Sequence, residues 1–142
     1  MIVSAKTEYA CIAMLELAAR HASDEPVRIR EIAEKHGVPS RFLVQILLQL
    51  KGAGLVNSTR GATGGYQLAR EPEEITLGEV MAVVDGQSND LSSNAQQETP
   101  ATRVLMENFR QIAAVQRDML SSTTFADLTQ QLQTQGEGMY YI

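Results

Sequence analysis

The sequence predicts a mainly α-helical fold, in which a winged helix-turn-helix with a small β-hairpin wing is followed by a long C-terminal helix. Three observations lead to this prediction. Two short segments of helical periodicity meet at a turn over residues 38–40, as in a helix-turn-helix. A glycine-rich stretch over residues 58–70 lies between two candidate strands, which indicates a hairpin. One amphipathic stretch then runs from about residue 102 to residue 120.

Length and composition favour one cytoplasmic domain with an appended helix. The chain has 142 residues, of which 44% are hydrophobic and 20% charged, values typical of a soluble globular protein. No apolar run approaches the roughly 18 residues that span a bilayer, and the N-terminus lacks the layout of a secretory signal. A single cysteine, Cys11, excludes an intrachain disulfide and suits a reducing compartment. We expect no membrane partner.

Charge is unevenly distributed along the chain. The formal net charge is −5, yet residues 26–70 carry seven lysines and arginines against two glutamates. Residues 71–142 carry three arginines against eleven acids. Because salt screens charges beyond about 8 Å, a local basic face can bind nucleic acid on an acidic protein. A solvated basic face fits the charge pattern equally well.

Helix signals accompany the first half of the chain. Ser4 is placed to cap a first helix, and Val27 and Ile29 bracket a charged residue in a way that predicts a small strand. The second helix is expected to end at Gly37, since glycine adopts the left-handed conformation that closes many helices. Ser40 is expected to cap the third helix.

The third helix is predicted to have two different faces and to close at Gly52 and Gly54. Its core face follows the i, i+3, i+4, i+7 spacing. The opposite face begins with polar groups, at the end where a recognition helix meets base edges. The core face comprises Leu43, Ile46, Leu47 and Leu50, and the opposite face comprises Arg41, Val44, Gln45 and Leu48.

The glycine-rich stretch is predicted to form the wing. Leu55 and Val56 begin one strand, residues 66–68 form its return partner, and residues 61–65 make the turn. Arg60 at the tip can reach into a groove of DNA. Tyr66 either donates to a phosphate or packs at the base of the hairpin, and packing is the preferred interpretation.

The second half begins with a further helix over residues 76–84, for which Thr76 and Glu79 predict a capping box. Residues 87–101 are polar and are expected to form a flexible loop. The long helix after this loop carries an apolar stripe that needs a partner surface, and a last short helix is expected from Thr124. We favour dimerisation over packing on its own domain. The stripe comprises Leu105, Phe109, Ile112 and Met119.

These motifs together resemble the Rrf family of bacterial winged-helix regulators, which includes the iron–sulfur cluster regulator, the nitric-oxide-responsive repressor and the cysteine-metabolism repressor. The resemblance is strongest over residues 1–86. It rests on SAKTEYA, IREIAEKHGVPSRFLVQILLQLKGAGLV, NSTRGATGGYQLAR and ITLGEVMAVVDG.

The resemblance implies a set of DNA-binding residues. Ser40, Arg41, Phe42 and Gln45 take the recognition-helix positions that address the major groove, and Arg60 matches the wing arginine that enters the minor groove. This agrees with the pairing of glutamine with adenine and of arginine with guanine. Phosphate contacts are expected from Lys6, Ser58 and Tyr66. Where some relatives have a glutamate this chain has Val44, so its DNA site is expected to differ.

The chain departs from the cluster-binding relatives, which place three cysteines over residues 87–103. None occurs there, and a cluster needs about four ligands, usually cysteines. Cys11 is expected to be a small buried hydrophobe, although with Glu8 it offers half a site across a dimer. His21 and His36 are expected to interact with helix C-termini rather than with a metal. We therefore predict no metal and no cofactor.

The sequence therefore predicts a homodimeric, sequence-specific regulator of transcription that binds double-stranded DNA, and the family resemblance implies that it acts as a repressor. Residues 1–86 form the DNA-binding domain, 87–101 the loop, and 102–142 the dimerisation helix and tail. A small-molecule or protein effector is favoured as the signal over oxidation of Cys11. The alternatives are a winged-helix module that binds proteins and a redox sensor whose cluster has non-cysteine ligands. No catalytic constellation indicates an enzyme.

Overall fold

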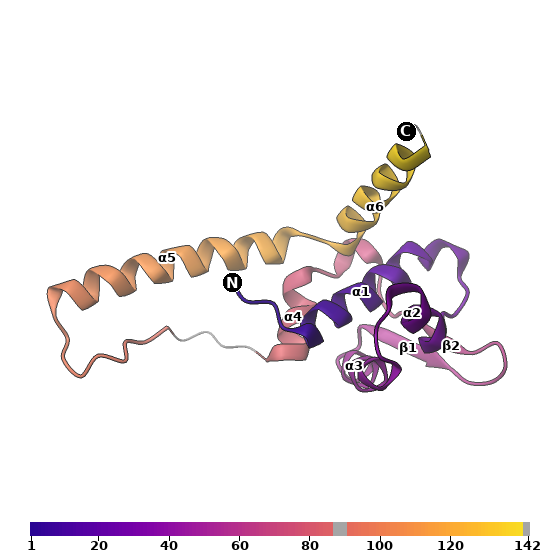
Figure 1. Cartoon of the computed structure of the whole chain (residues 1–142), viewed down its shortest axis with the longest axis horizontal. Helices are drawn as coiled ribbons and strands as arrows, with labels where there is room; N and C mark the ends of the chain where they lie inside the picture. The colour runs from indigo at the N-terminus through magenta and orange to yellow at the C-terminus, as the bar shows by residue number, and fades with distance from the viewer. Residues whose placement is uncertain (87–90, 141–142) are drawn as a thin grey trace.

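The computed structural model describes residues 1–86 and 91–140, the last four by their backbone alone. It confirms the predicted fold class: the chain is mainly helical, and one two-stranded antiparallel hairpin projects at one end of the helical body, packed against α1 and α3 (Figure 1). The elements in chain order are α1 (Ala5–Ala19), η1 (His21–Ser23), α2 (Ile29–His36), α3 (Ser40–Gly52), β1 (Val56–Thr59), β2 (Gly65–Leu68), η2 (Pro72–Glu74), α4 (Leu77–Asp85), α5 (Pro100–Ser122) and α6 (Phe125–Tyr140).

Helix α1 is the centre of the core. It contacts α3, α4, α6 and β2, and its inward side chains are small or flexible, which lets several elements approach it. The side chains of Ala10, Ala13 and Met14 are completely buried. The apolar face predicted for α3 is confirmed, since Leu43, Ile46, Leu47 and Leu50 are also completely buried. Packing against α1 therefore fixes which face of α3 remains exposed.

Three predicted helix ends are confirmed. The Ser4 hydroxyl accepts a hydrogen bond from the Thr7 amide at 3.1 Å. The Thr76 hydroxyl accepts one from the Glu79 amide at 3.1 Å. Gly37 closes α2 with φ of 67°, a left-handed conformation that favours glycine. Each of these signals acts within one turn, which is why the sequence reveals it.

Other local predictions are wrong in detail. Pro39, with an extended backbone, takes the N-cap position of α3, and Ser40 is already helical and makes no capping bond. Ile29 opens α2 instead of extending a strand, and only Val27 pairs with the wing. The Glu79 carboxylate turns to Arg70 at 2.6 Å, so the capping box is half formed. The last helix, α6, is longer than predicted.

The hairpin pairs Val56 with Leu68 and Thr59 with Gly65. Val27 adds a short third segment, because its amide donates to the Tyr66 carbonyl at 2.9 Å and the Tyr66 amide donates back at 2.8 Å. Tyr66 is half-buried beside the core, as the packing interpretation predicted. The base of the wing is thereby attached to the segment that leads into α2.

Helix α5 extends away from the rest of the molecule (Figure 1). Its C-terminal end rests on α4, where Gly78 lies against Leu120, and it contains no buried residue. Residues 91–99, which lead into it, form neither helix nor strand. Within the described residues, no helix combines the length and the apolar character that crossing a membrane would require.

Candidate nucleic-acid interface

The recognition-helix candidates lie together on the exposed side of α3. Arg41 and Gln45 are one turn apart and both are exposed, while the intervening Leu43 is completely buried. Ser40 is exposed at the first position of the helix. Arginine and glutamine are the side chains that make bidentate contacts with guanine and adenine. The N-terminal half of α3 therefore presents base-reading chemistry outward.

Phe42 and Val44 add apolar surface to the same helix, and Phe42 is 39% exposed. Its ring centroid lies 5.9 Å from that of Tyr9 in α1. The guanidinium carbon of Arg41 lies 5.3 Å from the centroid of the Phe42 ring. Nothing local in the sequence links Tyr9 to Phe42 in α3, because the two residues are 33 positions apart.

The wing carries Arg60 in an exposed position at the start of its turn. The Lys51 ammonium, near the end of α3, donates to the Ser58 hydroxyl on β1 at 2.7 Å. Helix and wing are therefore connected by side chains as well as by the short segment between them. Lys6 lies on a different element, in the first turn of α1, and is half-buried.

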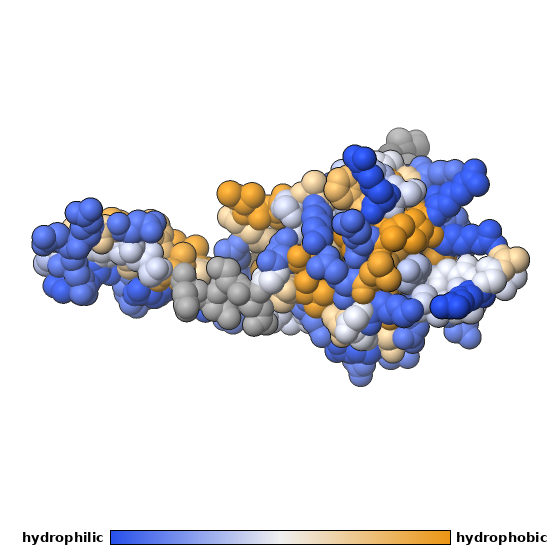
Figure 2. All heavy atoms as spheres, turned by 90° about the horizontal axis from the view of Figure 1, so that it is seen from below, coloured by the Kyte–Doolittle hydropathy of each residue, from blue (hydrophilic) through white to orange (hydrophobic). Residues whose placement is uncertain are grey.

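The surface seen from below the view of Figure 1 is mixed in character (Figure 2). Apolar side chains form several patches, with hydrophilic side chains between and around them. DNA-binding surfaces are more polar than protein–protein interfaces, and apolar groups within them contact thymine methyl groups. Exposed Phe42 and Val44 are compatible with such a surface.

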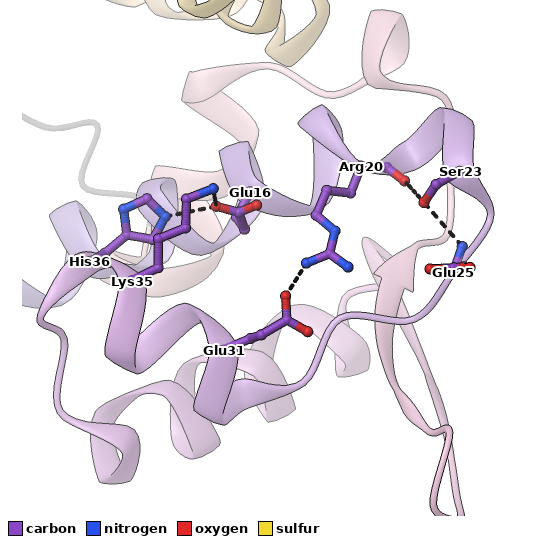
Figure 3. A network of polar contacts seen from close by, with 7 residues as sticks. All are labelled: Glu16, Arg20, Ser23, Glu25, Glu31, Lys35 and His36. Carbon is purple, nitrogen blue, oxygen red and sulfur yellow. Dashed lines mark hydrogen bonds and ion pairs between the residues drawn. The ribbon is translucent and has the colours of Figure 1, made fainter.

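An ion-pair network holds α2 against α1 (Figure 3). The Glu16 carboxylate is only 6% exposed and accepts from Lys35 Nζ at 2.9 Å and from His36 Nε2 at 2.8 Å. Burial by itself raises the pKa of Glu16, but the hydrogen bonds from Lys35 and His36 outweigh it and hold this pKa below its usual value. Arg20 pairs with Glu31 further along the two helices. The orientation of the helix-turn-helix thus depends on charges from α1.

The two histidines are accounted for by carboxylates. His36 ends α2 and contacts Glu16, whereas His21 lies in η1 at 3.2 Å from Glu71. In the described part of the chain, no three histidine, cysteine, aspartate or glutamate side chains gather as a metal site would require.

The surroundings of Cys11 bear on whether it could act as a redox group. Burial, with a smaller contribution from Asp85, raises its pKa to about 11. A thiol with this pKa is neutral at physiological pH, whereas oxidation proceeds through the thiolate. The chain has one thiol, and a thiolate-bound iron–sulfur cluster needs about four ligands, usually cysteines, so the residues do not fit such a cluster.

Comparison with known proteins identifies the family. Residues 3–131 match the Rrf2 family model, described as an iron-dependent transcriptional regulator. The chain belongs to the Rrf2 family. The resemblance found in the sequence is thereby confirmed, and this Rrf2 chain is a transcriptional regulator with a winged-helix fold. The iron dependence in the family description does not agree with the residues available here.

Relatives in sequence and in structure support the assignment. The Rrf2 chain is 35% identical over 143 residues to the HTH-type transcriptional regulator CymR of Bacillus subtilis, with full coverage of both chains. The solved structure of that protein, described as the global cysteine regulator of B. subtilis, superposes with a TM-score of 0.82 over 92% of this chain and 97% of its own. IscR of Aliivibrio salmonicida is 42% identical over 85 residues, which cover 60% of this chain and 50% of that one.

Proposed function

We propose that this Rrf2 regulator binds double-stranded DNA sequence-specifically as a homodimer and represses transcription. The observation that carries the proposal is the exposed polar end of α3 next to a basic wing. Arg41 and Gln45 face outward above a buried apolar face, and Arg60 is exposed on a hairpin joined to α3 through Lys51 and Ser58. In this proposal α3 enters the major groove and Arg60 enters the neighbouring minor groove.

In this proposal residues 1–86 bind DNA and residues 102–142 form the dimer. Of the segment 87–101 predicted as a loop, residues 87–90 lie outside the described residues, and the last two residues already belong to α5. The apolar stripe of α5 supports this division, because its residues are 51–66% exposed in the single chain. An open groove of about 900 Å³ between the N-terminal arm, α4 and the C-terminal half of α5 offers a surface for a second copy. The stripe comprises Leu105, Phe109, Ile112 and Met119.

The signal in this proposal is a small molecule or a protein partner. The single thiol of the chain supports this choice over a thiolate-bound cluster, and the raised pKa of Cys11 supports it over an oxidised thiol, since oxidation proceeds through the thiolate.

The test is selection from a random pool of duplexes, followed by affinity measurements at two salt concentrations. Arg60→Ala should weaken binding to the selected site by about 1–3 kcal/mol and relax preference for a narrow minor groove. The matched control is Arg30→Ala, which removes an exposed arginine that already pairs with Glu34 at 2.9 Å. Equal losses of DNA affinity in both variants would mean that Arg60 contributes only its positive charge and makes no specific contact with the minor groove. Absence of salt-dependent binding in the unmodified chain would favour the protein-interaction alternative.

A further inference from the structure

Phe42 exposes an aromatic ring at the point of α3 where polar base-reading groups are expected. The ring has a neighbour from another helix, since Tyr9 of α1 lies 5.9 Å away with the two planes inclined at 51°. Aromatic pairs favour such tilted arrangements at this separation. The Arg41 guanidinium lies 5.3 Å from the centroid of the same ring, within the range of a cation–π contact.

This arrangement of Arg41 is not what the helix alone would produce. Successive residues on an α-helix point about 100° apart, so the long side chain of Arg41 has to turn back to meet the Phe42 ring. An exposed arginine otherwise samples many rotamers and loses that freedom on binding. A ring that holds the guanidinium in advance lowers this entropic cost.

Both residues of the aromatic pair adjoin the core. Tyr9 precedes Ala10, which is completely buried. Phe42 precedes Leu43, which is also completely buried, and α3 packs against α1. The Tyr9–Phe42 pair therefore joins two helices whose backbones are both fixed by the core.

We propose that Tyr9 and Phe42 are positioning residues, which hold the Arg41 guanidinium ready for a guanine edge in the major groove. Tyr9 supports the ring, Phe42 provides the surface, and Arg41 makes the bidentate contact that guanine accepts. This inference rests on the proposed function and deepens it. It assigns part of the sequence preference to α1, which lies outside the helix-turn-helix.

The first test compares affinities for the selected duplex and for a scrambled one. Tyr9→Phe keeps the ring and should leave both affinities unchanged. Tyr9→Ala and Phe42→Leu should weaken binding to the selected duplex about two- to fivefold, the amount expected for a cation–π contact. Binding to the scrambled duplex should not change, because phosphate contacts are unaffected. Thermal unfolding of each variant checks that it is folded, and Phe42→Leu provides the test where Tyr9→Ala is too unstable.

A double-mutant cycle decides whether Phe42 acts through Arg41. If it does, Phe42→Leu should have no further effect in an Arg41→Ala background. An equal loss in both backgrounds would overturn the proposal, because Phe42 would then contact DNA itself or act on folding. A Tyr9→Phe variant as weak as Tyr9→Ala would overturn it too, since the Tyr9 hydroxyl would then be the functional group.

The stack of the Arg41 guanidinium on the Phe42 ring can also be observed without DNA. The Arg41 side-chain methylene protons should show upfield NMR shifts from the Phe42 ring, retained in Tyr9→Phe and lost in Phe42→Leu. Ordinary shifts in the unmodified chain would remove the basis of the proposal. Upfield shifts in a chain that binds no duplex would show that the stack exists while the proposed function fails, and the positioning role would fail with it.

Discussion

Glu16 places a carboxylate in the interior of the molecule, where an unpaired charge would be very costly. Hydrogen bonds from Lys35 and His36 make this position tolerable and link α1 to the end of α2 (Figure 3). Because the pKa of Glu16 is lowered in the folded chain, the ionised carboxylate favours folding. This contribution is present at pH values above the unfolded pKa and is lost as the pH falls through the folded one.

Glu16→Gln should therefore destabilise the folded chain by about 1–2 kcal/mol at pH 7, because glutamine keeps an acceptor oxygen but loses the charge that strengthens both hydrogen bonds. The difference from the unmodified chain should shrink as the pH falls below about 4. Urea unfolding at a series of pH values measures both effects. Glu34→Gln is the control, since it breaks only the exposed pair with Arg30, and an equal loss there would contradict the assignment.

At the scale of elements, the wing depends on close backbone approach. Gly65 opens β2 next to the bridge between Val27 and Tyr66, and a Cβ atom at this position would come within 2.5 Å of the Val27 carbonyl oxygen. A Cβ atom and a carbonyl oxygen do not approach each other so closely in proteins, so β2 and the segment around Val27 would have to move apart. A glycine here is required by the packing of the wing base.

Gly65→Ala should accordingly loosen the wing base and cost about 1–3 kcal/mol, as overpacking does elsewhere. Amide hydrogen exchange tests this directly, because the Val27 and Tyr66 amides bond to each other's carbonyls across the contact. Both should exchange faster in the variant. Gly52→Ala is the control, since a Cβ there meets nothing within 4 Å. Unchanged exchange in Gly65→Ala would show that the wing base adjusts at little cost.

The elements also indicate how far sequence reasoning reaches. The caps at Ser4 and Thr76 could be predicted because donor and acceptor lie within one turn. Ser40 was assigned wrongly because Pro39, its neighbour, already has the extended backbone of an N-cap. The contact of Tyr9 with Phe42 joins residues far apart in the chain, and only the folded packing of α1 on α3 brings them together.

At the scale of the whole molecule, α5 extends from the body with its apolar stripe exposed (Figure 1). Exposure of such a stripe to water over several turns is unfavourable. A second copy of the chain would cover it in the simplest way, because most oligomers of soluble proteins are symmetric dimers. The proposed dimer would also place two recognition helices for two half-sites about one helical turn of DNA, or a multiple of it, apart. Assembly and DNA affinity should therefore be lost together.

Ile112→Glu puts a charge in the middle of the stripe and should convert a dimer into a monomer, because an unpaired carboxylate cannot be buried at an apolar interface. Affinity for a two-half-site duplex should fall at least tenfold, while affinity for a single half-site should change little, since α3 and the wing remain intact. Light scattering gives the mass, and fluorescence anisotropy gives both affinities. Gln111→Glu adds the same charge at an exposed position of α5 that lies about 100° around the helix from Ile112 and outside the stripe, so it should leave mass and affinity unchanged. A monomeric unmodified chain, or an Ile112→Glu variant that remains dimeric, would mean that α5 packs against some other surface.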